Sequence, residues 1–148
     1  MIRVLMLIAA MGMTCCDRQT GPPNVSEKSV VRPGLSDRVT FVETYVRFRR
    51  QYVQLEYDIV FQNNSGGMVA GPSDWDVRLV AQVPVGELDD WIDQGMTASS
   101  APTQAWHVDT TKEIDTANVV EWYADSGRSV GIDRVKGIVA YRNHTMGQ

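Results

Sequence analysis

A serine flanked by glycines forms the most chemically suggestive pattern in the chain. Ser129 is the centre of a Gly-x-Ser-x-Gly stretch over residues 127–131, and Asp133 and His144 follow it in the order serine, acid, base. Nucleophilic catalysis would need the serine at a sharp turn from a strand into a helix, with the histidine held by an acid from a separate loop. Asp133 comes too soon after Ser129 to orient a histidine from behind. We therefore predict a glycine-flanked hairpin turn here, with a small hydrolase using Ser129 as an alternative.

Residues that could bind a metal ion or a cofactor form no recognisable set. His107 and His144 are the only histidines, and neither has a second ligand at helical or hairpin spacing. Asp74 and Asp76 could offer oxygens to calcium, but the loop with a central glycine and a final glutamate is missing. We expect no metal and no cofactor. None of the 18 acidic residues stands out, so a hydrolase that uses a carboxylate pair is a further alternative.

Large aromatic side chains are numerous, and tryptophan is enriched both in cores and in binding hot spots. Trp75 and Trp91 fall on apolar faces of expected elements, so we assign them to the core. The other tryptophans, one tyrosine and two nearby acids form a candidate contact surface: Trp106, Trp122, Tyr123, Glu121 and Asp125. Because Trp122 and Tyr123 are neighbours on an expected strand, one of the two rings faces outward. An outward ring with acidic neighbours suits a basic partner.

The chain is acidic, with 14 basic against 18 acidic residues and a formal net charge of −4. The basic residues are scattered except for Arg47, Arg49 and Arg50. Nucleic-acid binding needs a clustered cationic face, so we expect no nucleic-acid partner. The hydrophobic fraction of 43% and the charged fraction of 22% are typical of a folded globular domain.

The elements that must position these residues are mainly strands. In residues 53–61 every second position is apolar, and residues 75–83 repeat this alternation. Such alternation indicates strands with one face on a core and one face in water. We also expect strands at residues 119–123 and 136–142, with a turn at residues 125–128 after the first of them.

Two further segments have helical spacing. Residues 38–50 are rich in β-branched and aromatic residues, which favours a strand, although Phe41, Tyr45 and Phe48 also fall at helical spacing. Residues 86–94 are predicted to form a short helix that ends at Gly95. A small-residue loop is expected at 96–103. The sum is an α+β, mostly antiparallel β domain: a single sheet or a small sandwich with one short helix packed on it.

The N-terminus has the pattern of an exported chain. Arg3 supplies a positive charge, and residues 4–13 are then apolar or small throughout. As a helix this run spans about 15 Å, half of the roughly 30 Å of a bilayer core. It therefore indicates a secretory signal peptide, with a short buried helix as the alternative. Residues 17–36 are polar and contain proline and glycine, as expected of a flexible tether.

Both cysteines of the chain lie at the end of this leader. Their placement resembles the lipobox of bacterial lipoproteins, in which a cysteine directly after the apolar region is acylated and becomes the mature N-terminus. The resemblance covers residues 1–16 and identifies Cys16 as the lipidated residue, with Cys15 as the alternative. It implies anchorage in the bacterial cell envelope, facing the periplasm. Asp17 leaves the choice between inner and outer membrane open.

We therefore divide the chain into a signal peptide at 1–15, a lipid-anchored cysteine and tether at 16–37, and a single globular domain at 38–148. A binding protein is favoured over an enzyme: a tethered acidic module that contacts another protein or an envelope component. Its layout resembles that of small inhibitors and toxin-immunity lipoproteins. A structural accessory of an envelope complex is an alternative, beside the hydrolases named above.

Overall fold

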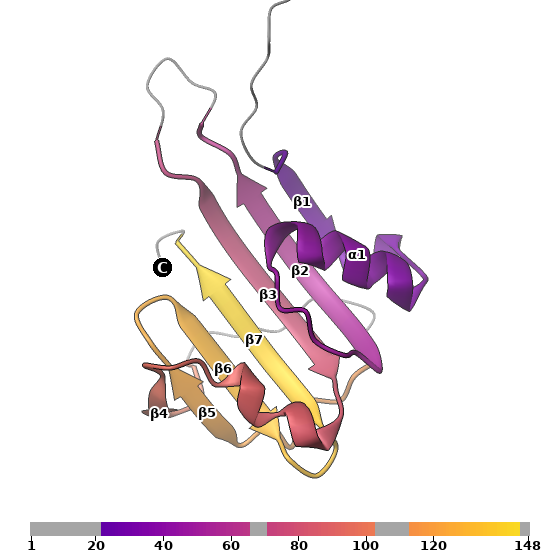
Figure 1. Ribbon diagram of the computed structural model, residues 1–148, viewed down its shortest axis with the longest axis vertical. Coiled ribbons are helices and arrows are strands. Elements are labelled where there is room, and N and C mark those ends of the chain that lie inside the picture. Colours follow the sequence, from indigo (N-terminus) through magenta and orange to yellow (C-terminus); the bar gives the residue numbers. More distant parts are fainter. Residues whose placement is uncertain (1–21, 66–70, 103–112, 146–148) are drawn as a thin grey trace, which may run out of the picture.

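The protein is built on a seven-stranded antiparallel sheet with helical segments on one face (Figure 1). The computed structural model describes residues 22–65, 71–102 and 113–145. Across the sheet the strands follow the order β1-β2-β3-β7-β6-β5-β4. Their bounds are β1 Val25–Lys28, β2 Gln54–Gln62, β3 Asp74–Gln82, β4 Thr97–Ser99, β5 Glu121–Ala124, β6 Arg128–Asp133 and β7 Ile138–His144. The α-helix α1 is Leu35–Tyr45, and short 3-10 helices lie at Ser29–Val31, Val85–Glu87 and Asp89–Trp91. The predicted class, a mostly antiparallel α+β fold with a single sheet, is confirmed.

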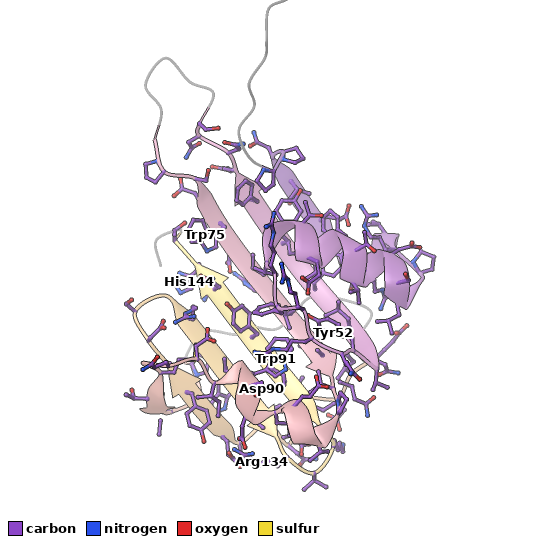
Figure 2. The ribbon with its side chains drawn as sticks, in the orientation of Figure 1. Tyr52, Trp75, Asp90, Trp91, Arg134 and His144 are labelled. Atoms are coloured by element: carbon purple, nitrogen blue, oxygen red, sulfur yellow. The ribbon has the colours of Figure 1, made fainter. Side chains whose placement is uncertain are left out.

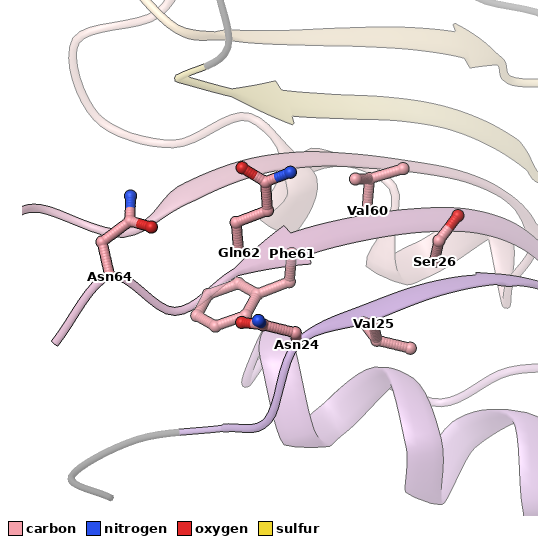
Figure 3. Close-up of a pocket in the computed structure, with 7 residues that line it drawn as sticks. All are labelled: Asn24, Val25, Ser26, Val60, Phe61, Gln62 and Asn64. Carbon is pink, nitrogen blue, oxygen red and sulfur yellow. The ribbon is translucent and has the colours of Figure 1, made fainter. Parts of the chain in front are cut away.

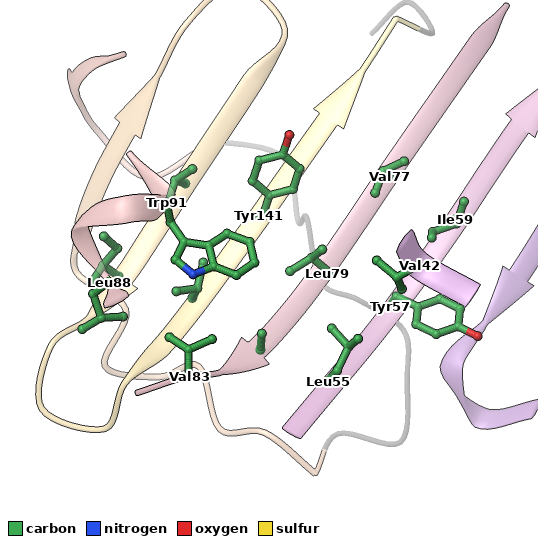
Figure 4. Packing of buried hydrophobic residues seen from close by; sticks show 14 residues of the cluster. Val42, Leu55, Tyr57, Ile59, Val77, Leu79, Val83, Leu88, Trp91 and Tyr141 are labelled. Atoms are coloured by element: carbon green, nitrogen blue, oxygen red, sulfur yellow. The ribbon is translucent and has the colours of Figure 1, made fainter. Parts of the chain in front are cut away.

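The two strands predicted from alternation are confirmed and lie side by side. β2 and β3 pair over their whole length, with Leu55 opposite Ala81 and Tyr57 opposite Leu79. These four residues point to one face of the sheet and are all buried. The neighbouring strands continue this face with Val130, Ile132, Val139 and Tyr141 (Figure 4). Each such side chain stabilises the fold by about 1.5–3 kcal/mol when it is fully buried.

α1 covers the β2 side of this core, so the strand predicted for residues 38–50 is wrong. Arg38, Val42 and Tyr45 follow one another at helical spacing and lie on the buried side of α1. Val42 is fully buried, and the Arg38 guanidinium donates a 3.0 Å hydrogen bond to the backbone carbonyl of Leu55. The helical period decides the structure because strand propensity mainly reflects packing context.

A second helical segment covers the β6–β7 side of the same core. The helix predicted for residues 86–94 is instead a pair of 3-10 helices, which bury Leu88 and Trp91 against the sheet. The segment is too short to sustain an α-helix by itself. Gly95 has a φ of 101°, so the left-handed residue predicted at its end is confirmed.

The sequence does not predict β1, β4 and β6. β1 lies in the segment assigned to the tether and pairs with β2. β4 lies within residues 96–103, so the loop predicted there is wrong at Thr97–Ser99. The turn predicted at residues 125–128 is confirmed, because Asp125 accepts hydrogen bonds from two backbone N–H groups of that turn. From Arg128 onward, however, the glycine-flanked stretch is part of β6, so a turn over the whole stretch is wrong.

The opposite face of the sheet has charged residues at its middle and a small second apolar cluster of Val80, Ile114 and Ile138. The two ends of the sheet are also distinct. β1 begins at the end where β2 and β7 stop, and the turn from β6 into β7 lies at the other end. Figure 2 shows Arg134 at the turn end, with Trp75 and His144 toward the end where β1 begins. Among the described residues, no helix has the length and apolar character needed to cross a membrane.

Candidate functional site

The tight turn between β6 and β7 is fixed by its backbone and by one buried acid. Asp133 accepts hydrogen bonds at Oδ1 from the N–H groups of Val135, at 2.9 Å, and Lys136, at 3.0 Å. Gly137 closes the turn with a 3.0 Å bond from its N–H to the carbonyl of Asp133, at a φ of 69°. A Cβ on Gly137 would lie 2.4 Å from the carbonyl oxygen of Val83, so only glycine fits. The turn is therefore held in one conformation.

This rigid turn presents an apolar side chain to solvent. Val135 is 91% exposed. Val120 is 77% exposed and lines a surface hollow together with Val135. Val53 and Val85 are more than half exposed at the same end. The N–H of Val53 bonds to the last residue of β3, and Val85 lies against the glycine that closes the turn. We call these four residues the valine end. Single exposed apolar residues are ordinary, whereas apolar residues gathered on one surface are a feature of interaction sites.

Both cations of the turn are paired within the chain. Arg134 lies 2.8 Å from Asp89 and 2.9 Å from Glu121, and Lys136 Nζ lies 2.8 Å from Asp115. Hydrogen bonds to Asp89 and Glu121 raise the pKa of Arg134, and the hydrogen bond to Asp115 raises the pKa of Lys136. Such exposed pairs contribute little to stability. The pairs do hold both cations against carboxylates of this chain. The exposed side chain of Val135 is therefore the part of the turn that a partner could contact.

Hollows flank the turn on both sides. The first has a volume of about 390 Å³ and is lined by Val120, Glu121, Asp133 and Val135, among others. We call it the Asp133 hollow. The second, of about 380 Å³, shares Val135 and Lys136 with the first. Val135 therefore stands between two concave areas that a partner surface could fill.

The two carboxylate oxygens of Asp133 have different partners. Asp133 is 4% exposed, and its Oδ1 accepts both hydrogen bonds of the turn. Its Oδ2 is buried and has no hydrogen-bond donor within the described residues. An unpaired buried acceptor costs about 1–3 kcal/mol, and such groups in folded proteins need an explanation. A donor that reached this oxygen would be stabilising.

Another charge cluster lies on the polar face of the sheet. Arg78 and Arg142 are directly opposite each other on β3 and β7. Asp76 accepts hydrogen bonds from both guanidinium groups, at 2.5–3.3 Å, and both of its oxygens are used. Burial raises the pKa of Asp76, but the hydrogen bonds from Arg142 and Arg78 outweigh it and hold that pKa below its usual value. Within this cluster, both oxygens of Asp76 are therefore occupied by the two arginines.

A third hollow, of about 410 Å³, lies at the end of the sheet where β1 begins (Figure 3). Its lining has no charged residue and consists of Asn24, Val25, Ser26, Val60, Phe61, Gln62 and Asn64. Of the three hollows, only the two beside the β6–β7 turn join apolar walls to charged groups.

The aromatic residues predicted for a contact surface lie in different settings. Trp122 is 7% exposed and packs over Gly131, where a Cβ would lie 2.7 Å from the indole ring. Tyr123 is half-buried, and its hydroxyl donates a 3.4 Å hydrogen bond to Glu121. Cys15, Cys16 and Trp106 lie outside the described residues.

The two predicted acids are both paired. Glu121 pairs with Arg134, and Asp125 pairs with Arg128, whose hydrogen bond lowers the pKa of Asp125. Glu121 also lines the Asp133 hollow, so the structure connects the predicted surface with the valine end. Sequence reasoning missed Val135; the available signal was an apolar residue between two cations in the segment before a predicted strand.

Ser129 is not at a strand-to-helix turn. It lies within β6, opposite Ala124 on β5 and Arg142 on β7. Asp133 is on the same strand, about 13 Å further along at the usual rise, and its Oδ1 accepts the hydrogen bonds of the β6–β7 turn. His144 lies opposite Asp76. The structure thus does not bring the serine, the acid and the histidine together.

In residues 22–65, 71–102 and 113–145, no three histidine, cysteine or acidic side chains gather as they would around a metal ion. Comparisons with protein-family models, with curated proteins and with solved structures each give no match.

Proposed function

We propose that this protein is a binding module that contacts a partner protein through the valine end. The observation that carries the proposal is the rigid β6–β7 turn, which holds Val135 at 91% exposure. A side chain that is already fixed in its contact geometry loses little conformational entropy on binding. The flanking hollows and the paired cations supply the complementary rim that surrounds the centre of a typical interface.

The position of the valine end supports a protein partner rather than the membrane surface. If Cys16 carries the lipid, the chain between Cys16 and Pro22 reaches at most about 20 Å. β1 begins near this tether, whereas the valine end lies at the other end of β2, a distance of about 30 Å for nine residues. An anchored molecule would therefore hold its tether end toward the bilayer and present the valine end away from it.

The anchor itself is proposed from the lipobox-like cysteine. Intact mass and membrane fractionation of the natively expressed chain, compared with Cys16→Ala, test it. We expect the native form to lose its first fifteen residues, gain acyl mass and fractionate with membranes, while the variant does none of these. A full-length chain in the cytoplasm would overturn the proposed location.

Site-specific photo-crosslinking tests the contact surface. A photoreactive amino acid is placed at position 135 in the full chain, with position 31 as the matched control, since Val31 is also an exposed valine. We expect one defined crosslinked product from position 135 and none from position 31. The partner identified by crosslinking should, once purified, bind the wild-type chain. Its affinity for the Val135→Asp variant should be at least about tenfold lower, as expected for a hot-spot residue. Equal crosslinking at both positions, or equal affinity for both chains, would contradict the proposal.

A further inference from the structure

Residues 84–96, which we call the strap, have backbone hydrogen bonds only among themselves. The strap contains the 3-10 helices Val85–Glu87 and Asp89–Trp91 and ends in a turn where the N–H of Met96 bonds to the carbonyl of Asp93. In the part of the chain that the structure describes, every hydrogen bond between backbone groups that involves the strap joins two of its own residues. No such bond therefore ties the strap to the sheet beneath it.

Side chains hold the strap in place. Leu88 and Trp91 are buried against the sheet (Figure 4). Each acid of the strap is contacted from outside it: Asp89 by Arg134 at 2.8 Å, Asp90 by Arg50 at 3.4 Å, Asp93 by Arg128, and Glu87 by the backbone N–H of Gln51 at 3.3 Å. The three arginines come from the β6–β7 turn, the segment between α1 and β2, and the start of β6. Because these ion pairs are exposed, each one is weak and is screened by salt.

The closed strap leaves polar atoms without partners. Trp91 Nε1, Tyr52 Oη and Arg50 Nε are buried and have no hydrogen-bond partner among the described residues. The Trp91 ring packs on Phe48 at 4.8 Å and on Tyr52 at 6.2 Å between ring centroids, so two of these atoms belong to one aromatic cluster (Figure 2). Unpaired buried groups regain hydrogen bonds with water when their cover lifts, which favours an open strap. Apolar burial of Leu88 and Trp91, which favours the closed strap, is thus opposed by three desolvated polar atoms.

The strap also forms part of the valine end. Val85, near its start, is one of the four valines, and its Cγ2 lies 3.6 Å from the position of a Cβ on Gly137. Asp89 pairs with Arg134 of the β6–β7 turn. Lifting the strap would separate Val85 and Asp89 from the turn, so the valine end is complete only while the strap is closed.

We infer that the strap lifts from the sheet as one unit while the sheet stays folded, and that its closure regulates the valine end. The second part rests on the proposed function, because it concerns the partner that the valine end binds. Segments with few contacts to the rest of the fold open at a lower free energy than core strands. A partner that binds only the complete surface would hold the strap closed, since a ligand shifts a conformational equilibrium toward the state that it binds better.

Native-state hydrogen exchange of the full chain at increasing urea concentrations tests the first part. The reporters are the strap amides of Trp91, Ile92 and Met96, and the reference is β3, which is paired on both sides. We expect the three strap amides to share one opening that is at least about tenfold more frequent than that of β3. Its urea dependence should be measurable but smaller than that of β3, because less surface is exposed. Strap amides that exchange only together with β3, or without any urea dependence, would overturn the inference.

Two kinds of variant separate opening of the strap from unfolding of the sheet. Combining Asp89→Asn, Asp90→Asn and Asp93→Asn removes the three ion pairs, so the opening of the strap should become about tenfold more frequent. Asp76→Asn is the matched control, since it makes the same chemical change on the polar face of the sheet, where the contacts persist in the open state. It should speed exchange in β3 and leave the strap amides unchanged. A strap that does not respond to the triple variant, or that responds to Asp76→Asn as strongly as β3 does, would overturn the inference.

The partner identified by crosslinking tests the second part. At a saturating concentration of this partner, exchange of the strap amides should slow by at least about tenfold. Unchanged strap exchange in a complex that crosslinks at position 135 would overturn the regulation and leave the proposed function intact. If no partner is crosslinked, the proposed function is wrong, and exchange in the isolated protein still decides whether the strap opens as a unit.

Discussion

Asp76 and Asp133 are both carboxylates of low exposure on the sheet, and the structure uses them in opposite ways. The Asp76 side chain is 12% exposed and both of its oxygens are occupied by arginines of neighbouring strand positions. Asp133 is more deeply buried, yet only one of its oxygens has partners. Asp76 therefore has hydrogen-bond donors for both oxygens, whereas Oδ2 of Asp133 has none among the described residues.

The difference separates an acid that neutralises two arginines from an acid that shapes a turn. Arg78 and Arg142 are like charges directly opposite each other, an arrangement that destabilises a sheet unless an acid lies between them. Asp76 is that acid, so its role is complete without a ligand. Asp133 shapes a turn through Oδ1 and leaves Oδ2 unpaired beside a hollow. The predictions below test this contrast, from the largest expected change in stability to the smallest.

Asp76→Asn should cause the largest loss of stability. It leaves two opposed arginines without a counter-charge, and breaking a partly buried ion cluster in this way costs about 2–3 kcal/mol. Urea denaturation followed by circular dichroism would measure the loss in the free energy of unfolding. Asp133→Asn provides the contrast, because the asparagine oxygen can still accept both turn hydrogen bonds, and it should lose less stability than Asp76→Asn. If both variants lost stability equally, the distinction between the two acids would not hold.

Gly137→Ala should destabilise the protein by about 2 kcal/mol, since it places a methyl group into a backbone carbonyl at a left-handed position. The turn should also lose its fixed shape, which would appear as exchange broadening of its amide signals. Gly86→Ala is the matched control because nothing lies within 4 Å of its added Cβ. A loss of similar size in the control would show that glycine content, rather than the turn, is responsible.

Part of the fold could be predicted from the sequence. The alternation over residues 53–61 and 75–83 located the two longest strands, because a period of two has one simple structural meaning. The helix at α1 was missed because its residues satisfy both a helical period and a strand composition. Only packing of Val42 onto β2 decides between them.

The site depends on pairings that a single sequence does not encode. Trp122 is buried because Gly131 lies opposite it and leaves space for the indole ring, and this follows from the register of β5 with β6. Likewise, Val135 and Asp133 form a surface only once β6 and β7 are joined by a turn at Gly137. Which side chains are exposed, and which acceptors lack a donor, can be seen only in the folded structure.

Acidification should reduce the stability gap between the wild type and Asp76→Asn. The pKa of Asp76 is lower in the folded than in the unfolded chain, because the bonds from Arg142 and Arg78 outweigh the effect of burial. Its contribution is therefore complete above the unfolded pKa, near 3.9, and is lost as the pH falls through the folded value. Urea denaturation of both proteins between pH 7 and pH 2 would measure the gap. A gap that stayed constant down to pH 2 would contradict this role for Asp76.

Val135→Ser should have the smallest effect on stability and the largest effect on binding. A side chain that is 91% exposed contributes almost nothing to the core, so the free energy of unfolding should stay within about 0.5 kcal/mol of the wild type. Val31→Ser, at another exposed valine, should match it in stability, and only the variant at position 135 should lose affinity for the crosslinked partner. The two acids make this separation possible: Asp76 stabilises the sheet, while Asp133 fixes the turn that presents Val135. A marked loss of stability in Val135→Ser would show that this valine packs within the fold instead of projecting from it.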